Sequence, residues 1–285
     1  MKALRALSGL VPGARPLARS ALFRVRHLGA DRRVLPDFII VGAQKAGTTS
    51  LFSYLRQHAA IRMSYVKEVH YFDHNHHRGE RWYRSHFPFS KSLPTGTLVG
   101  EASPYYLVHP HAPRRIRELL PSTKLIALLR NPVERAISHY FHERSRGREP
   151  MGLRDALRAE EERNGAEWDR MLRDDGYISP THHIYSYKQR GAYVDQLERY
   201  LEWFDRGQIL IMQAERLFAD PGTAVVQICA FLGIAPDSVP VDYSPRNEGV
   251  YEANRLDEDR AYLVSYFAPF NGRLFSLLGE RWDWG

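Results

Sequence analysis

The chain has 285 residues, of which 44% are hydrophobic, so it suits one large α/β domain or two small ones and is not predicted to be disordered. Its net charge of +7 does not indicate nucleic-acid binding, because residues 1–34 hold eight basic residues and one acidic residue, which leaves 32 of each sign in the rest. The single cysteine, Cys229, can form no internal disulfide and offers no metal cluster, and it favours a reducing, cytoplasmic compartment.

This charge distribution divides the chain into a basic N-terminal segment, residues 1–34, and a domain, residues 35–285. The longest uncharged run of the segment, residues 6–14, is interrupted by glycine and proline. It is far shorter than the roughly 20 residues of a membrane-spanning helix, so we expect no transmembrane helix. Apolar residues recur at helical spacing, which leaves three hypotheses open: peripheral contact with an anionic membrane, a transit peptide, or a solvated tail.

Short, continuous apolar runs bounded by glycine, proline or charge predict strands that are covered on both faces, as in a parallel sheet. In chain order these runs are residues 38–41, 97–99, 125–129 and 209–212. Helical patterns separate them, at residues 51–55, 113–120, 132–143, 153–175 and 193–204. This alternation predicts an α/β fold with a P-loop-like core, in which a mostly parallel central sheet is flanked by helices.

The loop after the first strand carries the most information about chemistry. The strand ends at Gly42, small residues follow, and a helix opens with three hydroxyl residues. Backbone amides at such a turn, together with the positive end of the helix, form a binding site for an anion. The residues predicted to bind it are Lys45, Ala46, Gly47, Thr48, Thr49 and Ser50.

The position of the lysine in this loop distinguishes two chemistries. In a nucleotide-hydrolase loop the lysine directly follows the second glycine and works with Mg²⁺ at the β- and γ-phosphates. Here Thr48 takes that position and Lys45 lies inside the loop, where it can stabilise charge that develops on a leaving phosphate oxygen. No metal-holding aspartate follows the strand at residues 125–129, so we expect no metal. A P-loop small-molecule kinase is the enzymatic alternative, and a binding protein of the same fold is the non-enzymatic one.

A second phosphate-binding pair follows the strand at residues 125–129. Arg130 comes directly after this strand, and Ser138 lies two turns into the next helix, which Asn131 and Pro132 begin. An arginine at the carboxyl end of a parallel strand points to the crevice where ligands of α/β folds bind, and its guanidinium suits a phosphate. We therefore predict that Arg130 and Ser138 bind a phosphate together.

Two candidate bases lie between these motifs. Glu68 and His70 are two residues apart, so in an extended segment they would share a face, and either could accept a proton. Apolar neighbours, at residue 69 and residues 71–72, predict partial desolvation of Glu68, which would raise its pKa. The residues alone leave open which of the two is the base.

Together these segments resemble the sulfotransferase family that uses 3′-phosphoadenosine 5′-phosphosulfate (PAPS) as donor. Within it they resemble the branch of heparan sulfate N- and 3-O-sulfotransferases, as a soluble member of bacterial type. The resemblance runs, with gaps, over residues 36–284. It implies that Lys45 is the catalytic lysine of the loop that binds the 5′-phosphosulfate, and that Arg130 and Ser138 hold the 3′-phosphate. PAPS and a small-molecule or saccharide acceptor are then the expected partners, without nucleic acid.

The same resemblance implies that Glu68 is the base, with His70 in reserve, and that Tyr251 lies near the adenine. The sequence departs from the branch at two places. The heparan-type enzymes carry a lysine after the glutamate of the next strand, where this chain has Glu101-Ala102-Ser103. They also have a disulfide-stapled loop over the donor, where residues 246–251 are short and contain no cysteine. The first difference leaves the acceptor open, because the resemblance implies that this lysine helps to position donor and acceptor.

Overall fold

The computed structural model describes residues 26–236, 241–244 and 256–284. Tyr251 and residues 1–25 of the basic segment lie outside these ranges, so the predictions that fall on them are not tested by the fold. Among the helices of the described ranges, none is long and apolar enough to cross a membrane.

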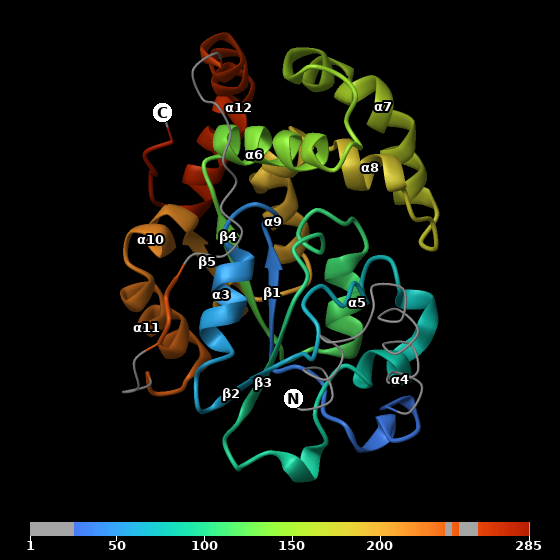
Figure 1. The fold of residues 1–285 in the computed structure, drawn as a ribbon, viewed down its shortest axis with the longest axis vertical. Helices are drawn as coiled ribbons and strands as arrows, with labels where there is room; N and C mark the ends of the chain where they lie inside the picture. The colour runs from blue at the N-terminus through green and yellow to red at the C-terminus, as the bar shows by residue number, and fades with distance from the viewer. Residues whose placement is uncertain (1–25, 237–240, 245–255, 285) are drawn as a thin grey trace.

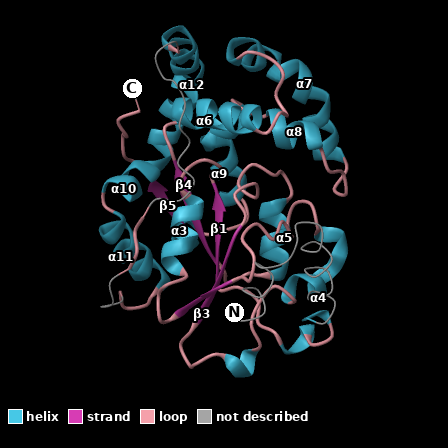
Figure 2. Ribbon diagram, viewed as in Figure 1, coloured by secondary structure: helices cyan, strands magenta, loops and turns pink. Residues whose placement is uncertain are grey.

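A β-sheet lies at the centre of the described chain and is surrounded by helices (Figure 1, Figure 2). The described strands follow the order β2-β3-β1-β4-β5, and each neighbouring pair runs parallel. They are β1 (Phe38–Gly42), β2 (Ile61–Met63), β3 (Leu98–Ala102), β4 (Lys124–Leu129) and β5 (Ile209–Gln213). Every residue of β1 is buried, as its continuous apolar sequence predicts for a strand covered on both faces. The predicted α/β fold class is confirmed.

The helical patterns seen in the sequence all correspond to helices, with shifted ends. The α-helices of the described ranges are α3 (Thr48–Leu55), α4 (Gly79–Arg84), α5 (Ala112–Leu119), α6 (Pro132–Ser145), α7 (Leu153–Arg173), α8 (Pro180–Tyr185), α9 (Tyr193–Leu201), α10 (Ala214–Ala219), α11 (Pro221–Leu232) and α12 (Asp257–Leu278). The sequence analysis did not predict β2, α4, α8 or the helices from α10 onward. β2 has only three residues, too few for a period to be recognised.

The predicted strand at residues 97–99 was too short, because β3 continues to Ala102. Glu101 interrupts the apolar run, yet its side chain is fully buried in the strand. Its carboxylate accepts hydrogen bonds from the hydroxyl groups of Tyr83, Ser103 (2.7 Å) and Tyr106 (2.8 Å). A buried carboxylate that is hydrogen-bonded in this way is compatible with a sheet interior, and hydropathy alone does not reveal such partners.

The order of the strands brings two loops together at one edge of the sheet. β1 lies between β3 and β4, and Gly42 at the end of β1 pairs with Ala127 of β4. The chain passes to one side of β1 to form β2 and β3, and then to the other side to form β4 and β5. Ligands of open α/β sheets bind at such a switch point, outside the carboxyl ends of the strands. The loops after β1 and β4 therefore meet where a ligand is expected.

A layer of helices covers this carboxyl edge. The arrow of β1 points toward α6, and α7, α8 and α12 gather in the same region (Figure 1). A second hydrophobic cluster, separate from the core around the sheet, holds this layer together and includes Ile137 of α6, Leu157 of α7 and Phe267 of α12. The carboxyl edge of the sheet is thus enclosed between the main core and a second small core.

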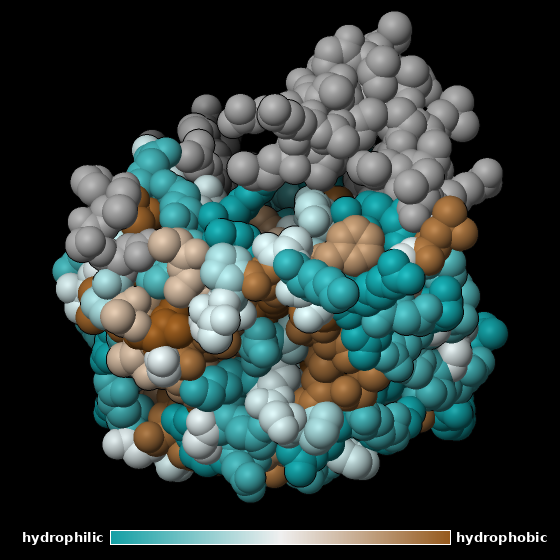
Figure 3. Space-filling view, turned by 90° about the horizontal axis from the view of Figure 1, so that it is seen from below, coloured by the Kyte–Doolittle hydropathy of each residue, from teal (hydrophilic) through white to brown (hydrophobic). Residues whose placement is uncertain are grey.

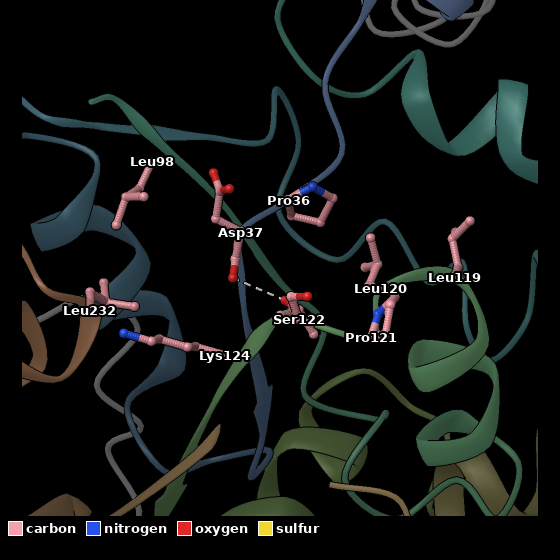
Figure 4. A pocket seen from close by; sticks show the side chains of 10 residues that line it. Pro36, Asp37, Leu98, Leu119, Leu120, Pro121, Ser122, Lys124 and Leu232 are labelled. Atoms are coloured by element: carbon pink, nitrogen blue, oxygen red, sulfur yellow. Dashed lines mark hydrogen bonds between the residues drawn. The ribbon is translucent and has the colours of Figure 1, made fainter. Parts of the chain in front are cut away.

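A cavity of about 360 Å³ lies at the opposite, amino end of the strands (Figure 4). Its lining includes Asp37, which precedes β1, Leu98 at the start of β3, and Lys124 at the start of β4. Viewed from this side, the surface is largely hydrophilic with apolar patches between polar residues (Figure 3). Because the strands are parallel, the cavity cannot include the loops that follow β1 and β4.

The described end of the basic segment lies against the domain. Arg26 donates hydrogen bonds to the carbonyl oxygens of Ser85 (2.6 Å) and Phe87 (2.8 Å), and its guanidinium lies 3.5 Å from the centre of the Tyr65 ring. Arg33 donates to the same Phe87 carbonyl at 2.7 Å and is itself buried. Residues 26–34 therefore pack against the domain, although the charge distribution in the sequence assigned them to a separate segment.

Candidate active site

The loop between β1 and α3 has a backbone that few side chains tolerate. Lys45 has a φ of 69° and Gly47, which precedes the first residue of α3, has a φ of 84°. A Cβ atom at Gly47 would lie 2.6 Å from Cε1 of Phe218, so glycine is required there both for conformation and for space. The first amides of α3 have no partners within the helix, and they open onto this loop. This arrangement is suited to binding a phosphate or sulfate group.

Arg130 contacts the backbone of Lys45. Nη1 of Arg130 donates to the carbonyl oxygen of Lys45 at 3.2 Å, which connects the loop after β1 to the end of β4. Burial lowers the pKa of Lys45, and the charges of Arg130 and Arg146 lower it further. Several positive charges are therefore held close to one another, which favours an anion among them.

The turn from β4 into α6 is fixed by hydrogen bonds. Oδ1 of Asn131 accepts from the amide of Val133 at 2.9 Å, which is the predicted N-cap. The amide of Asn131 donates to Oε1 of Glu215 at 2.8 Å, so the turn is also tied to α10. Ser138 lies two turns along α6 and is buried. The assignment of Arg130 and Ser138 to one phosphate stays a prediction.

Glu68 and His70 lie in an unusual backbone segment, with φ values of 62° and 55°. Residues other than glycine rarely adopt positive φ, and such strain is concentrated at functional sites. Nε2 of His70 lies 3.9 Å from Oε2 of Glu68, while its Nδ1 donates to Oδ2 of Asp73 at 2.7 Å. Nζ of Lys67 donates to Oε1 of Glu68 at 2.5 Å. Glu68, His70 and Asp73 thus form a line of alternating charge.

The expectation of a raised pKa for Glu68 is wrong, although burial acts in the expected direction. Burial raises the pKa of Glu68, but the interaction with the His70 imidazole outweighs it. This interaction and the charge of Lys67 together lower the pKa of Glu68 to about 2. Burial opposes the charge on His70, but Asp73 and Glu68 outweigh it and raise the pKa of His70 to about 10. At neutral pH Glu68 is then a carboxylate and His70 an imidazolium. Of the two, only Glu68 has a free lone pair for a proton.

The end of β3 supports this segment. The amide of Glu68 donates to the carbonyl oxygen of Ala102 at 2.8 Å, and the amide of His70 donates to Oγ of Ser103 at 3.1 Å. Ser103 in turn donates to the buried carboxylate of Glu101. The residues at which the sequence departs from the heparan-type pattern therefore hold the backbone of both candidate bases.

His142 of α6 connects the two halves of the site electrostatically. Burial lowers the pKa of His142 to about 4, and the charges of Lys45 and Arg146 act in the same direction, while Glu68 opposes them. His142 therefore lies within electrostatic range of both the loop lysine and the candidate base. The sequence analysis did not single out His142 or Arg146. Their only signal was the density of basic residues at the end of α6.

Arg190 is a further residue that no motif revealed. It is buried, and its Nη1 donates to Oε1 of Gln44 in the loop after β1. Its other nitrogens donate to Oγ of Ser186 at 2.8 Å and to the carbonyl oxygen of His183 at 2.6 Å. Arg190 therefore joins the loop after β1 to α8, across 146 residues of sequence. One group of side chains in the described ranges has ligand atoms close enough to hold a metal ion, namely His70, Asp73 and His74.

Comparison with known proteins gives consistent matches. The family model described as "Sulfotransferase domain" matches residues 35–245. The human protein named heparan sulfate glucosamine 3-O-sulfotransferase 6 is 32% identical over 90% of this chain and 76% of its own length. The mouse heparan sulfate glucosamine 3-O-sulfotransferase 3A1 is 36% identical over 90% of this chain and 66% of its own length.

A solved structure shows the same fold. The crystal structure of a sulfotransferase from Alicyclobacillus acidocaldarius superposes with a TM-score of 0.71 at 33% sequence identity. The match covers 88% of this chain and 99% of that one. The similarity therefore extends over nearly all of the parallel sheet and its surrounding helices.

Proposed function

The chain belongs to the sulfotransferase family and is a sulfotransferase, and on this basis we propose that it transfers a sulfuryl group from PAPS to a hydroxyl or amine of a carbohydrate. The contact between Arg130 and the backbone of Lys45 is the observation that supports the donor assignment, because it joins two basic residues at the loop after β1. The saccharide acceptor is proposed from the relatives, whose names give heparan sulfate glucosamine as their substrate.

In this proposal the loop holds the 5′ end of the donor. The amides and hydroxyl groups of Thr48, Thr49 and Ser50 bind the phosphosulfate, while Arg130 and Ser138 bind the 3′-phosphate. Lys45 lies near the oxygen that bridges phosphorus and sulfur, where negative charge appears as the bond to sulfur breaks. The lowered pKa of Lys45 reflects burial among other cations, and an incoming anion would relieve that repulsion.

Glu68 acts as the base in the same proposal. The acceptor oxygen or nitrogen attacks sulfur, its proton passes to the Glu68 carboxylate, and adenosine 3′,5′-bisphosphate leaves. The support is electrostatic, since His70 is held as an imidazolium between Glu68 and Asp73 and has no lone pair to accept a proton. His70 then orients Glu68 and stays the reserve candidate for the base.

The donor site can be tested by comparing adenosine 3′,5′-bisphosphate with AMP in calorimetry. We expect the bisphosphate to bind roughly ten- to a hundredfold more tightly, because a charge-assisted hydrogen bond contributes about 1.5–3 kcal/mol. Arg130→Ala should remove most of this difference. Arg144→Ala is a control, since Arg144 lies on the helix that follows Arg130 but binds the carbonyl oxygens of Glu149 and Pro150. Equal affinity for both nucleotides would contradict the assignment.

The reaction is tested with a labelled sulfuryl group on PAPS and a panel of saccharide, lipid and phenol acceptors. Lys45→Ala should abolish most of the turnover while retaining bisphosphate binding, because its charge is needed mainly in the transition state. Turnover with ATP and Mg²⁺ instead of PAPS would favour the kinase alternative. Transfer only to phenols or lipids would retain the sulfotransferase but overturn the saccharide acceptor.

Location and membrane contact stay predictions. The cytoplasmic compartment is inferred from a single cysteine, which is buried in α11. Peripheral contact with a membrane is inferred from residues 1–34, and no contact in the described part of the chain supports it. The hypothesis of membrane contact therefore concerns only the basic N-terminal segment, residues 1–34.

A further inference from the structure

A cluster of histidines includes His70 and extends from it on the side away from Glu68. His70, Asp73 and His74 each offer one ligand atom, and these atoms lie within 4.8 Å of one another. The rings of His70 and His74 are stacked, with centroids 5.0 Å apart and an angle of 15° between their planes. Asp73 lies at the centre of the group, where its Oδ2 accepts from Nδ1 of His70 at 2.7 Å.

A fourth imidazole approaches the cluster from a distant part of the sequence. The ring of His183, on α8, lies edge-on to His74 with centroids 4.9 Å apart, and 6.0 Å from the ring of His70. Nε2 of His74 and Nδ1 of His183 are both buried and have no hydrogen-bond partner among the described residues. Two neighbouring imidazole nitrogens without partners are unusual in a buried site and call for an explanation.

The donor set matches a particular class of ion. Imidazole nitrogen and carboxylate oxygen are the usual ligands of Zn²⁺ and similar divalent transition metals, which take three or four such ligands. The carboxylates of Asp73 and Glu68, which favour a proton on His70, also favour a cation at the same place. Two guanidinium groups lie near the cluster. That of Arg190 is engaged by Gln44, Ser186 and the His183 carbonyl, and that of Arg115 by the carbonyl oxygens of Phe72 and Asp73.

We propose that His70, Asp73 and His74 bind a divalent transition metal ion such as Zn²⁺, with His183 in the fourth position. The ion replaces the proton that Nδ1 of His70 shares with Asp73, and that proton is released to solvent. A shift of the ligand atoms is required, since atoms up to 4.8 Å apart must approach to distances set by bonds of about 2.0–2.2 Å. Rotation of the His183 and His74 side chains supplies it.

Binding at this site should inhibit the enzyme, and this consequence rests on the proposed function. Nε2 of His70 lies 3.9 Å from Glu68, so an ion on the other nitrogen of the same ring brings a second positive charge toward the base. Attraction to this charge holds the Glu68 carboxylate against the His70 ring and away from the acceptor. Zn²⁺ would thus act as an inhibitor that binds beside the acceptor, away from the phosphate-binding loop.

The binding test uses the full-length protein after removal of metals by chelation. Co²⁺ is followed by its visible d–d absorption and Zn²⁺ by calorimetry, and we expect one ion per chain. His74→Ala should weaken binding at least tenfold, a loss expected when a ligand or its supporting contact is removed. His77→Ala is the matched control, because His77 is an exposed histidine close in sequence and outside the cluster. It should bind as the wild type does.

Several outcomes would overturn the site. Equal affinity of wild type, His74→Ala and His77→Ala would identify adventitious binding by surface histidines, and the absence of Co²⁺ absorption would show that no ligand cage forms. If His74→Ala does not fold, as judged by thermal melting and bisphosphate binding, His183→Ala takes its place and should also weaken Zn²⁺ binding.

The inhibition is measured separately, as the rate with Zn²⁺ relative to the metal-free rate of the same variant. We expect inhibition of the wild type and of His77→Ala, and at least tenfold less sensitivity in His74→Ala. Metal binding without inhibition would overturn the inhibitory role and retain the site. No turnover in metal-free buffer with any acceptor would instead count against the proposed function, because the Co²⁺ measurement does not depend on activity.

Discussion

Lys45, Glu68 and His70 are the described non-glycine residues with positive φ, and all three belong to the candidate active site. Such a conformation costs on the order of 1–3 kcal/mol for each residue and persists only where surrounding contacts impose it. Here those contacts are visible: Arg130 holds the Lys45 carbonyl, while Ala102 and Ser103 hold the amides of Glu68 and His70. The fold therefore fixes the positions of the reactive side chains through their backbones.

The roles of Glu68 and His70 can be separated by substitution. Glu68→Gln keeps the shape of the side chain but cannot accept a proton, so turnover should fall roughly 10²–10⁴-fold, the usual contribution of a general base. His70→Ala should reduce turnover less, because it removes only the group that orients Glu68. Steady-state assays with saturating PAPS, and bisphosphate affinity measured separately, make the comparison. Normal turnover of Glu68→Gln with an inactive His70→Ala would assign the base to His70.

The junction of β1, the loop and α3 depends on a glycine for two separate reasons. Gly47 has a φ of 84°, and a Cβ atom there would lie 2.6 Å from the Phe218 ring. Gly96 has a φ of 80°, but a Cβ atom there would meet no other atom within 4 Å. These two glycines therefore share the conformational requirement, while only Gly47 carries the steric one.

Alanine substitutions at the two glycines should separate these effects. Each should lose about 1–2 kcal/mol of unfolding free energy, the cost of a left-handed conformation for a residue with a Cβ atom. Gly47→Ala should lose more and should also weaken bisphosphate binding, because Phe218 must move at the mouth of the loop. Adding Phe218→Ala should recover the steric part alone. Denaturant unfolding and calorimetry measure both quantities, and equal losses at the two glycines would show that Phe218 yields without cost.

The N-terminal segment bears on the stability of the whole molecule. Arg26 and Arg33 donate three hydrogen bonds to the carbonyl oxygens of Ser85 and Phe87, in the turn that follows α4. The boundary expected at residues 34 and 35 divides regions of different charge, whereas these contacts extend across it. A domain that begins at residue 35 stays a prediction that truncation can test.

Two truncated proteins distinguish the charged segment from the contacting one. Deletion of residues 1–25 retains Arg26 and Arg33, and the unfolding free energy of this protein is the reference value. Deletion of residues 1–33 should lower it on the order of 2 kcal/mol, less than the sum of three charged hydrogen bonds because Arg26 is partly exposed. Both proteins should retain turnover where they are folded. Equal unfolding free energies of the two proteins would show that the hydrogen bonds of Arg26 and Arg33 add no net stability to the folded protein.

The features that could be predicted from the sequence lie within short stretches of chain. The strand, loop and helix around Lys45, and the strand, arginine and capped helix around Arg130, are each encoded in fewer than about 20 residues, because propensity, capping and helix dipoles act locally. The alternation of these units was enough to predict the α/β fold. Glu68 and His70 were recognised as neighbours for the same reason.

Contacts between particular side chains, near or distant in sequence, became known from the folded chain alone. The pKa of Glu68 is lowered rather than raised because His70 and Lys67 turn toward it, and apolar neighbours in sequence could not reveal that. Arg190 reaches Gln44, and His183 reaches His74, across more than a hundred residues. Electrostatic and hydrogen-bond energies depend on distances between atoms in space. The packing of α6 and α8 over the carboxyl edge of the sheet sets these distances, and the order of residues in the sequence does not reveal them.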